Sequence, residues 1–422
     1  MALEGSGVAR TVERPRVSRW ASFQDPGFKQ FWIAHLAAGF AVQIQTVAVG
    51  WQVYDLTRDP FDLGLVGMSQ FLPALLLVLV TGAASDRYPR RTIMCVCLMG
   101  EALCAAALLL FTIRGGQDVR VVFAILVGLG TARAFYSPAR QSIVPNIVAP
   151  AHLANAVTLN TTAVQVATIA GPVAGGLLYG VAPQAAYGVA FCLLAAAAAT
   201  VLFIPRPAQR AVADYPSWET LSAGFRFIWR QKIVLGAISL DLFAVLLGGA
   251  VALMPVYARD ILEVGPWGLG LLRAAPAVGA IALAYYLISN PIERHAGRIM
   301  LVAVFCFGLC TLVFGLSEIV WVSVVALALM GACDMVSVYV RNTLVQLWTP
   351  DAVRGRVNAV NQVFIGASNE VGGFRAGLTA AFVGPVPAVV LGGLGTMIIA
   401  MVWRHQFPQL RAIQRLDGIT EP

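Results

Sequence analysis

Twelve long apolar segments follow one another along most of the chain, between residues 30 and 404. Each approaches the roughly 20 residues that an α-helix needs to cross a lipid bilayer. Lipid leaves no backbone group unpaired, and the segments do not alternate as barrel strands do, so we expect helices. The sequence therefore predicts an all-α membrane protein of twelve transmembrane helices, with spans at 30–54, 64–85, 92–113, 119–139, 156–181, 185–204, 233–257, 267–290, 297–316, 318–340, 356–381 and 385–404.

The composition excludes a soluble globular protein. Apolar residues make up 59% of the 422 residues and charged residues only 12%, against roughly 45–50% and 25% in soluble domains. The seven cysteines all fall within predicted spans and lack the spacing of a metal site. We therefore expect neither a metal nor another cofactor. Residues 1–29 lack the short apolar core of a cleavable signal peptide.

The positions of the cations predict the orientation in the membrane. Most of the 29 lysines and arginines lie in the two tails and in the gaps that follow even-numbered spans. Cytoplasmic loops carry such an excess, so both termini are predicted to be cytoplasmic. The net charge of +8 then reflects topology, and nucleic acid is not an expected partner.

The chain repeats itself. An offset of 206 aligns residues 63–94 on residues 269–300 without gaps, and an offset of 201 aligns Arg140 with Arg341 and Asn160 with Asn361. A duplicated bundle with its binding site between the halves is a transporter architecture. The predicted division is a tail (1–29), a six-helix bundle (30–204), a linker (205–232), a second six-helix bundle (233–404) and a tail (405–422).

The linker contains "SWETLSAGFRFIWRQK", in which apolar residues recur at helical spacing with arginines between them. This pattern predicts an amphipathic helix. It lies either at the cytoplasmic lipid boundary or packed on the underside of the bundle.

Two motifs carry a resemblance to the major facilitator superfamily. "GAASDRYPRR" resembles the loop between helices 2 and 3, and "GPVAGG" resembles the Gly-Pro motif in helix 5 of the superfamily's antiporters, mostly exporters. With "YSPARQSIVPNIV" and "RGRVNAVNQ", the pattern is most similar to the branch that contains the enterobactin exporter and macrolide efflux proteins. The resemblance implies two rocking six-helix bundles in a bacterial cytoplasmic (inner) membrane. Its motif residues are Gly82, Asp86, Arg87, Arg90 and Arg91, and Gly171, Pro172, Gly175 and Gly176.

Each motif admits two interpretations. The loop arginines fix the cytoplasmic boundary of helices 2 and 3, while Asp86 could also accept hydrogen bonds from the start of helix 11 and favour the outward-open state. The helix 5 glycines could be packing sites against helix 8. Pro172 is expected to kink helix 5 and so to shape the cavity or its gate.

Ionisable residues inside spans are costly and call for a partner or a purpose. Arg133 aligns with Asp334 at the offset of 201. The resemblance implies that helices 4 and 10 approach each other where the cytoplasmic gate closes, so these two residues form a candidate gate pair of the outward-open state. Alternatively, each snorkels or pairs within its own half.

Other buried charges are candidates for a proton or substrate site. A carboxyl group in apolar surroundings holds its proton more tightly, and Asp241, which aligns with His35, is the first candidate. Glu101 is expected to pack against an internal donor, and Glu370 could form a static ion pair with Arg273. The set is His35, Asp241, Glu101, Glu370 and Arg273.

Polar side chains also form stripes at helical spacing on helices 1, 5 and 11. Such a stripe either lines a cavity or bonds helices to one another. The candidate lining residues are Gln43, Thr46, Gln165, Asn358, Asn361 and Gln362.

These features favour a secondary transporter, by alternating access, that exports a small amphipathic molecule such as a siderophore or drug in exchange for protons. The expected partners are that molecule, protons and the bilayer, and the chain is expected to be a monomer. ATP-driven transport and enzyme activity lack support, because neither of the two lysines follows glycine and no HExxH or GxSxG motif is present. The alternatives are an importer or lysophospholipid transporter of the same fold, or a non-transporting receptor.

Overall fold

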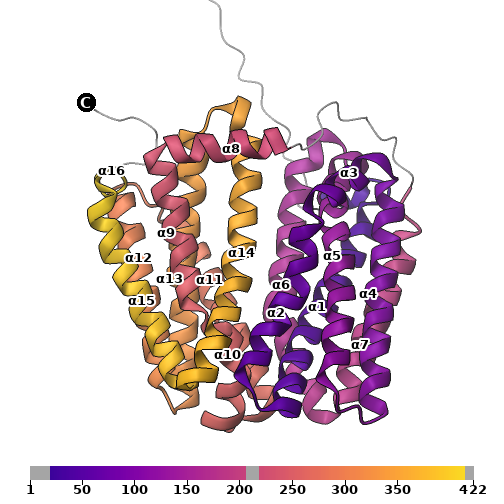
Figure 1. Cartoon of the computed structure of the whole chain (residues 1–422). Helices are drawn as coiled ribbons and strands as arrows, with labels where there is room; N and C mark the ends of the chain where they lie inside the picture. The colour runs from indigo at the N-terminus through magenta and orange to yellow at the C-terminus, as the bar shows by residue number, and fades with distance from the viewer. Residues whose placement is uncertain (1–19, 206–217, 414–422) are drawn as a thin grey trace, which may run out of the picture.

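The computed structural model describes residues 20–205 and 218–413, with side chains except at 79, 86, 218–223, 351 and 352. Most of the two predicted tails and the first part of the linker lie outside these residues. The described chain is helical without strands, and its helices form two bundles side by side (Figure 1). The first contains η1 (Ala21–Gln24), α1 (Phe28–Thr57), α2 (Pro60–Leu76), α3 (Val78–Arg87), α4 (Arg90–Ile113), α5 (Val119–Ile147), η2 (Pro150–His152), α6 (Leu153–Val181) and α7 (Pro183–Val201).

The second bundle follows the linker helix α8 (Trp218–Arg230). The end of the molecule that carries α8 and α3 is called the linker side, and the opposite end, with the α1–α2 turn, the far side (Figure 1). The second bundle contains α9 (Lys232–Gly248), α10 (Ala250–Val256), η3 (Tyr257–Ile261), α11 (Gly265–Ser289), α12 (Ala296–Leu316), α13 (Val320–Trp348), α14 (Asp351–Val383), α15 (Pro385–Gln406) and α16 (Pro408–Ala412).

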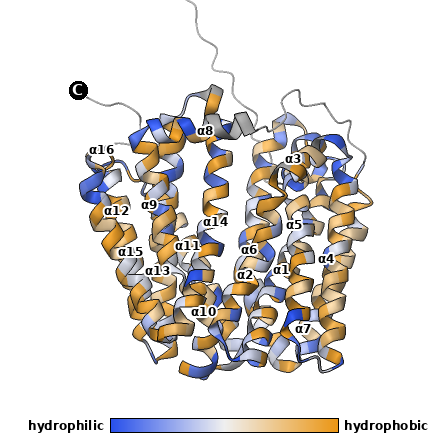
Figure 2. Ribbon diagram, in the orientation of Figure 1, coloured by the Kyte–Doolittle hydropathy of each residue, from blue (hydrophilic) through white to orange (hydrophobic). Residues whose placement is uncertain are grey.

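Ten segments of the described chain are long and apolar enough to cross a membrane. The other two predicted spans, 64–85 and 356–381, correspond to the α2–α3 pair and to α14. α2 has only 17 residues, and α14 carries Arg356, Glu370 and Arg375 within its 33. Figure 2 shows hydrophobic residues along most of α4, α12 and α15, and hydrophilic residues gathered at both ends of the bundles.

Two predicted spans are broken in the structure. The helix predicted at 64–85 breaks at Leu77, one turn after Pro73, whose missing N–H and bulky ring weaken a helix. The helix predicted at 233–257 breaks at Gly249, which has φ of 49°. This left-handed conformation suits glycine, and a Cβ there would stand 2.8 Å from the carbonyl oxygen of Gly372. The chain then continues as α10 and the π-helical η3.

Helices α5 and α13 extend about two turns beyond their predicted ends at 139 and 340, to Ile147 and Trp348. The prediction ended each helix where the hydropathy falls. Helical hydrogen bonds do not need lipid around them, so the backbone continues through the first arginines. The added turns contain Arg140 and Arg341, both of which form buried polar contacts.

At two places the bundles bring backbone against backbone. α6 packs on α11, and α14 packs on α2. A Cβ at Gly176 would overlap the carbonyl oxygen of Pro266, and a Cβ at Gly377 would stand 2.7 Å from that of Pro60. Gly176 and Gly377 are repeat equivalents, as are Pro60 and Pro266. The repeat therefore builds two matching glycine contacts between the halves.

The linker helix α8 packs on α14 through one face. Gly224 lies against the carbonyl oxygen of Arg356, and Ile228 is fully buried among apolar residues of the second bundle. Phe225 and Trp229 stack on each other and are 47% and 66% exposed, and the ring of Phe225 also meets that of Phe364 of α14, with 6.3 Å between centroids. The helix thus packs on the bundle and leaves part of its aromatic surface exposed.

Candidate functional site

A cavity of about 1070 Å³ lies between the two bundles. Its lining comes from α1, α2, α3 and α5 on one side and from α9 to α14 on the other. It begins near Thr46 and Gly50, towards the far side, and runs to Gly82 and Gln141 near the linker-side ends of α3 and α5. The cavity therefore extends to the linker side.

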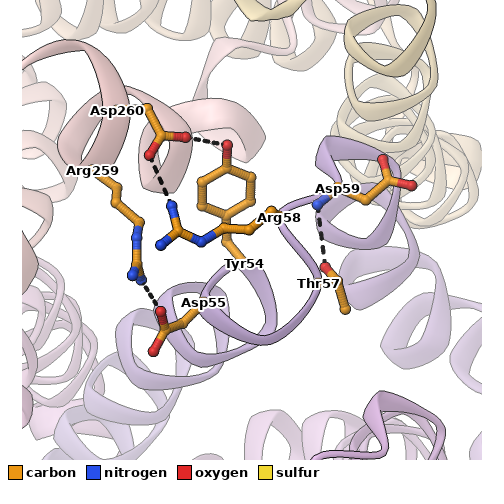
Figure 3. A network of polar contacts seen from close by, with 7 residues as sticks. All are labelled: Tyr54, Asp55, Thr57, Arg58, Asp59, Arg259 and Asp260. Atoms are coloured by element: carbon orange, nitrogen blue, oxygen red, sulfur yellow. Dashed lines mark hydrogen bonds and ion pairs between the residues drawn. The ribbon is translucent and has the colours of Figure 1, made fainter.

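A polar network closes the far side (Figure 3). The hydroxyl of Tyr54 donates to Asp260, and Nη1 of Arg58 donates to the same carboxylate at 3.2 Å. Arg259 forms an ion pair with Asp55. The hydrogen bonds and ion pairs that join described side chains of the two halves all lie in this network. Among the described side chains, the polar links between the halves thus lie at the far side.

Sequence reasoning missed this network. A signal was present: Tyr54 and Asp260 are separated by the repeat offset of 206, so they occupy equivalent ends of helices 1 and 7. Asp260 also lies in the π-helical η3, a form of helix that is frequent at functional sites.

Arg133 lines the cavity and has its partners in its own half. Its Nη1 donates to Oε1 of Gln70 at 2.7 Å, and its Nε lies 3.7 Å from Oε2 of Glu101, which is fully buried. Asp334 lines the same cavity without an ion pair within 4 Å among the described residues. The two candidate gate residues are therefore apart in this conformation.

Asp241 forms a buried ion pair with Arg341, and the two residues are 5% and 3% exposed. It lines a side pocket of only about 10 Å³ and not the large cavity. In the other half, Nη1 of Arg140 donates to Nε2 of His35 at 3.2 Å. The sequence aligned His35 with Asp241 and Arg140 with Arg341, under two different offsets. Only the structure shows that the two aligned residues of each half, one from each alignment, contact each other.

Arg273 and Glu370 both line the cavity, yet no ion pair within 4 Å joins them, in contrast to the predicted static pair. The carboxylate of Glu370 lies against Gly67 of α2, where a Cβ would overlap it. The guanidinium of Arg273 lies beside Gly50 of α1. Each charged side chain therefore reaches across to the opposite half.

The loop motif ties helix ends together. Arg90 donates to the carbonyl oxygen of Ser142 and Arg91 to that of Ile204, both at 2.7 Å. Arg87 is exposed. The side chain of Asp86 lies outside the described residues, so its predicted contact with helix 11 stays a prediction.

The motif in α6 packs against two helices. Gly171 and Gly175 lie against Gln43 and Ile44 of α1, whereas Gly176 lies against α11. Pro172 is inside α6, which continues through it.

Of the candidate lining residues, Thr46 and Gln362 line the cavity. Gln43 packs beneath Gly171, Gln165 is half-buried on α6 and Asn358 is exposed. Asn361 is buried, and its Oδ1 has no hydrogen-bond partner. Among the described residues, no group of three or more His, Cys, Asp or Glu is arranged to hold a metal ion.

Solved structures of several transporters share this fold. A bacterial homolog of the human lysosomal transporter Spinster, inward-facing and unoccupied, superposes with a TM-score of 0.72 and 12% identity, covering 94% of this chain and 98% of that one. A bacterial homologue of the iron transporter ferroportin, also inward-facing, gives a TM-score of 0.66 and 13% identity, covering 92% and 98%.

Curated relatives match nearly the whole chain. The enterobactin exporters EntS of Shigella boydii serotype 18 and of Escherichia coli O139:H28 are each 26% identical over 406 residues, covering 92% of this chain and 94% of the relative. A family described as transmembrane secretion effector matches residues 17–421. Together with a cavity between two repeated helical bundles, this match shows that the chain is a multi-pass membrane transporter, not an enzyme, and belongs to the transmembrane secretion effector family of the major facilitator superfamily.

Proposed function

We propose that the chain exports a small amphipathic molecule across the bacterial inner membrane by alternating access, in exchange for protons. The observation that carries the proposal is a cavity of about 1070 Å³ between the bundles, which the polar network closes on the far side and which extends to the linker side. The positive-inside rule makes the linker side cytoplasmic. In this conformation, the cavity would then load its substrate from the cytoplasm.

The lining of the cavity suits a molecule with an apolar body and a few polar groups. Phe71, Val245, Phe307 and Met330 contribute apolar surface, and charges are few. Ligand pockets of this kind use apolar walls for affinity and isolated polar groups for orientation. The curated relatives are named exporters of enterobactin, which places siderophores beside drug-like compounds among the molecules to test.

Export requires the cavity to close on the linker side and open on the far side. We infer that Arg133 then leaves Gln70 and Glu101 and pairs with Asp334. The exchange is testable by charge swapping. Arg133→Asp and Asp334→Arg should each abolish transport, and the double variant should recover part of it in a vesicle assay. A double variant as inactive as the single ones would contradict the pair.

Transport itself is tested in inverted membrane vesicles with an acidic lumen, using labelled catecholate siderophores, macrolides and lysophospholipids. We expect at least one compound to accumulate in the lumen, and the accumulation to collapse when the pH gradient is dissipated. Vesicles without the chain are the control. Accumulation only in right-side-out vesicles would indicate import, and no accumulation in either orientation would refute the proposal.

A further inference from the structure

Arg273 is the arginine of the cavity whose guanidinium lacks a described partner. Its Nε is buried without a hydrogen-bond acceptor, and no described carboxylate lies within 4 Å. By contrast, Arg133 donates to Gln70, and Arg375 donates from Nε to the carbonyl oxygen of Leu246 at 2.9 Å. A buried charged group left without a partner is costly, so an acceptor from outside the described chain would be stabilised here.

The structure keeps the space around this guanidinium open. A Cβ at Gly50 would stand 3.6 Å from Nη2 of Arg273 and 3.4 Å from Pro255, so a longer side chain at position 50 would fill that space. The carboxylate that could neutralise Arg273, that of Glu370, is held to one side against Gly67 of α2. Both glycines line the cavity.

The repeat shows that this arrangement is specific to one side of the cavity. Gly67 is the repeat equivalent of Arg273, and Ile169 is the equivalent of Glu370. The cation therefore occurs beside the α6–α11 contact and has no counterpart beside the α2–α14 contact. The turn that carries Arg273 is seated by Gly270, where a Cβ would stand 2.5 Å from the carbonyl oxygen of Pro172.

We propose that Arg273 binds an acidic group of the transported molecule, so that the substrates of this chain are amphipathic organic acids. The planar fork of a guanidinium matches a carboxylate or similar anion, and the apolar lining receives the remainder of the molecule. Glu370 lines the same cavity and is the carboxylate that would compete with this acidic group for Arg273. The inference rests on the proposed transport function and specifies its substrate class.

Two fluorescent probes with the same apolar body test the proposal. N-dansyl-phenylalanine carries one carboxylate, and N-dansyl-phenylalaninamide is its neutral analogue. Binding to the full chain in lipid nanodiscs is followed by fluorescence anisotropy. We expect the acid to bind more tightly by roughly 10- to 100-fold, the ratio that charge-assisted hydrogen bonds provide. Equal affinities, or no binding of either probe, would overturn the proposal.

Variants that are expected to change the affinity for the acid in opposite directions distinguish recognition from misfolding. Arg273→Gln should remove the preference for the acid, and Arg273→Lys should keep part of it, because the charge remains but the fork is lost. Glu370→Gln removes the competing carboxylate and should bind the acid more tightly than the unmodified chain. Arg298→Gln makes the same change at an exposed position of α12 and should leave the ratio unchanged. An unaltered ratio in Arg273→Gln would refute the assignment.

Counterflow of the acidic probe in proteoliposomes distinguishes this inference from the proposed function. Selective binding of the acid without flux would uphold the binding site and refute transport. Flux without a preference for the acid would uphold transport and refute the role of Arg273.

Discussion

The two halves place an arginine at the same point of the repeat but give it different partners. In the second half, Arg341 is neutralised by the carboxylate of Asp241. In the first half, Arg140 donates to the imidazole of His35, which lies where the repeat puts Asp241. The repeat therefore keeps the position of the arginine in both halves but not the charge of the residue that it contacts. The second half depends on an ion pair, whereas the first half tolerates a cation with a hydrogen-bond acceptor.

The largest effect is expected when the ion pair is broken. Asp241→Ala leaves the guanidinium of Arg341 buried without its counter-charge and should cost about 3–5 kcal/mol of stability. The free energy of unfolding in mixed micelles, followed by tryptophan fluorescence, measures the loss. The double variant Asp241→Ala/Arg341→Met should regain most of it, since no buried charge remains. A loss below about 1 kcal/mol in the single variant would mean that the pair is solvated.

The glycine contacts extend the comparison to the surfaces between the halves. Gly176→Ala and Gly377→Ala each push a methyl group into facing backbone and should each cost about 1–3 kcal/mol. Thermal melts and transport rates of the purified variants provide the measurement. Gly180→Ala, one turn along α6 with nothing within 4 Å of its Cβ, is the matched control. A loss of stability in only one of the two variants would show that the two glycine contacts do not contribute equally.

In the far-side network, two repeat-equivalent residues, Tyr54 and Asp260, contact each other. Asp260→Asn removes the charge that Tyr54 and Arg58 contact. Because the Arg58–Asp260 ion pair is partly exposed, its loss should stabilise the far-side-open state, relative to the far-side-closed state, by about 1 kcal/mol. In a chain without native cysteines, Thr46→Cys should react faster with a thiol reagent added from the far side. Glu318→Gln, an exposed carboxylate of the α12–α13 turn, should not change the rate. An unchanged rate in Asp260→Asn would show that other contacts close this end.

The smallest effect is expected from making the first half resemble the second. His35→Asp gives Arg140 the carboxylate that Arg341 already has. A buried ion pair gains little over a well-packed neutral alternative, so stability should change by about 1 kcal/mol or less. The free energy of unfolding is compared between His35→Asp and His35→Leu. Leucine provides no hydrogen-bond acceptor for Arg140, so His35→Leu should be clearly less stable. Strong destabilisation by aspartate would indicate that the site excludes a second charge.

Features that repeat along the sequence could be predicted, and features that depend on contacts between distant residues could not. The offset of 206 that aligned Gly64 with Gly270 reflected a real pair of inter-half contacts. The partners of Asp241 and Arg133 could not be identified in the same way. Arg341 lies in a turn that hydropathy assigned to a loop, and Glu101 lies on a different helix from Arg133.

The broken helices show a second limit. Hydropathy reports whether a segment prefers lipid, and it is nearly blind to whether the backbone continues as one helix. Pro73 and the pair Gly248–Gly249 were the signals for the two breaks, but proline and glycine are common in membrane helices and rarely decide the question alone.

The contacts at Gly176 and Gly377 are made by main chain on main chain, and this has a consequence for evolution. These two backbone contacts do not depend on which side chains line the cavity. Descendants of such a scaffold can therefore change the lining of the cavity by substitutions at a few positions, while these contacts between the halves are inherited intact.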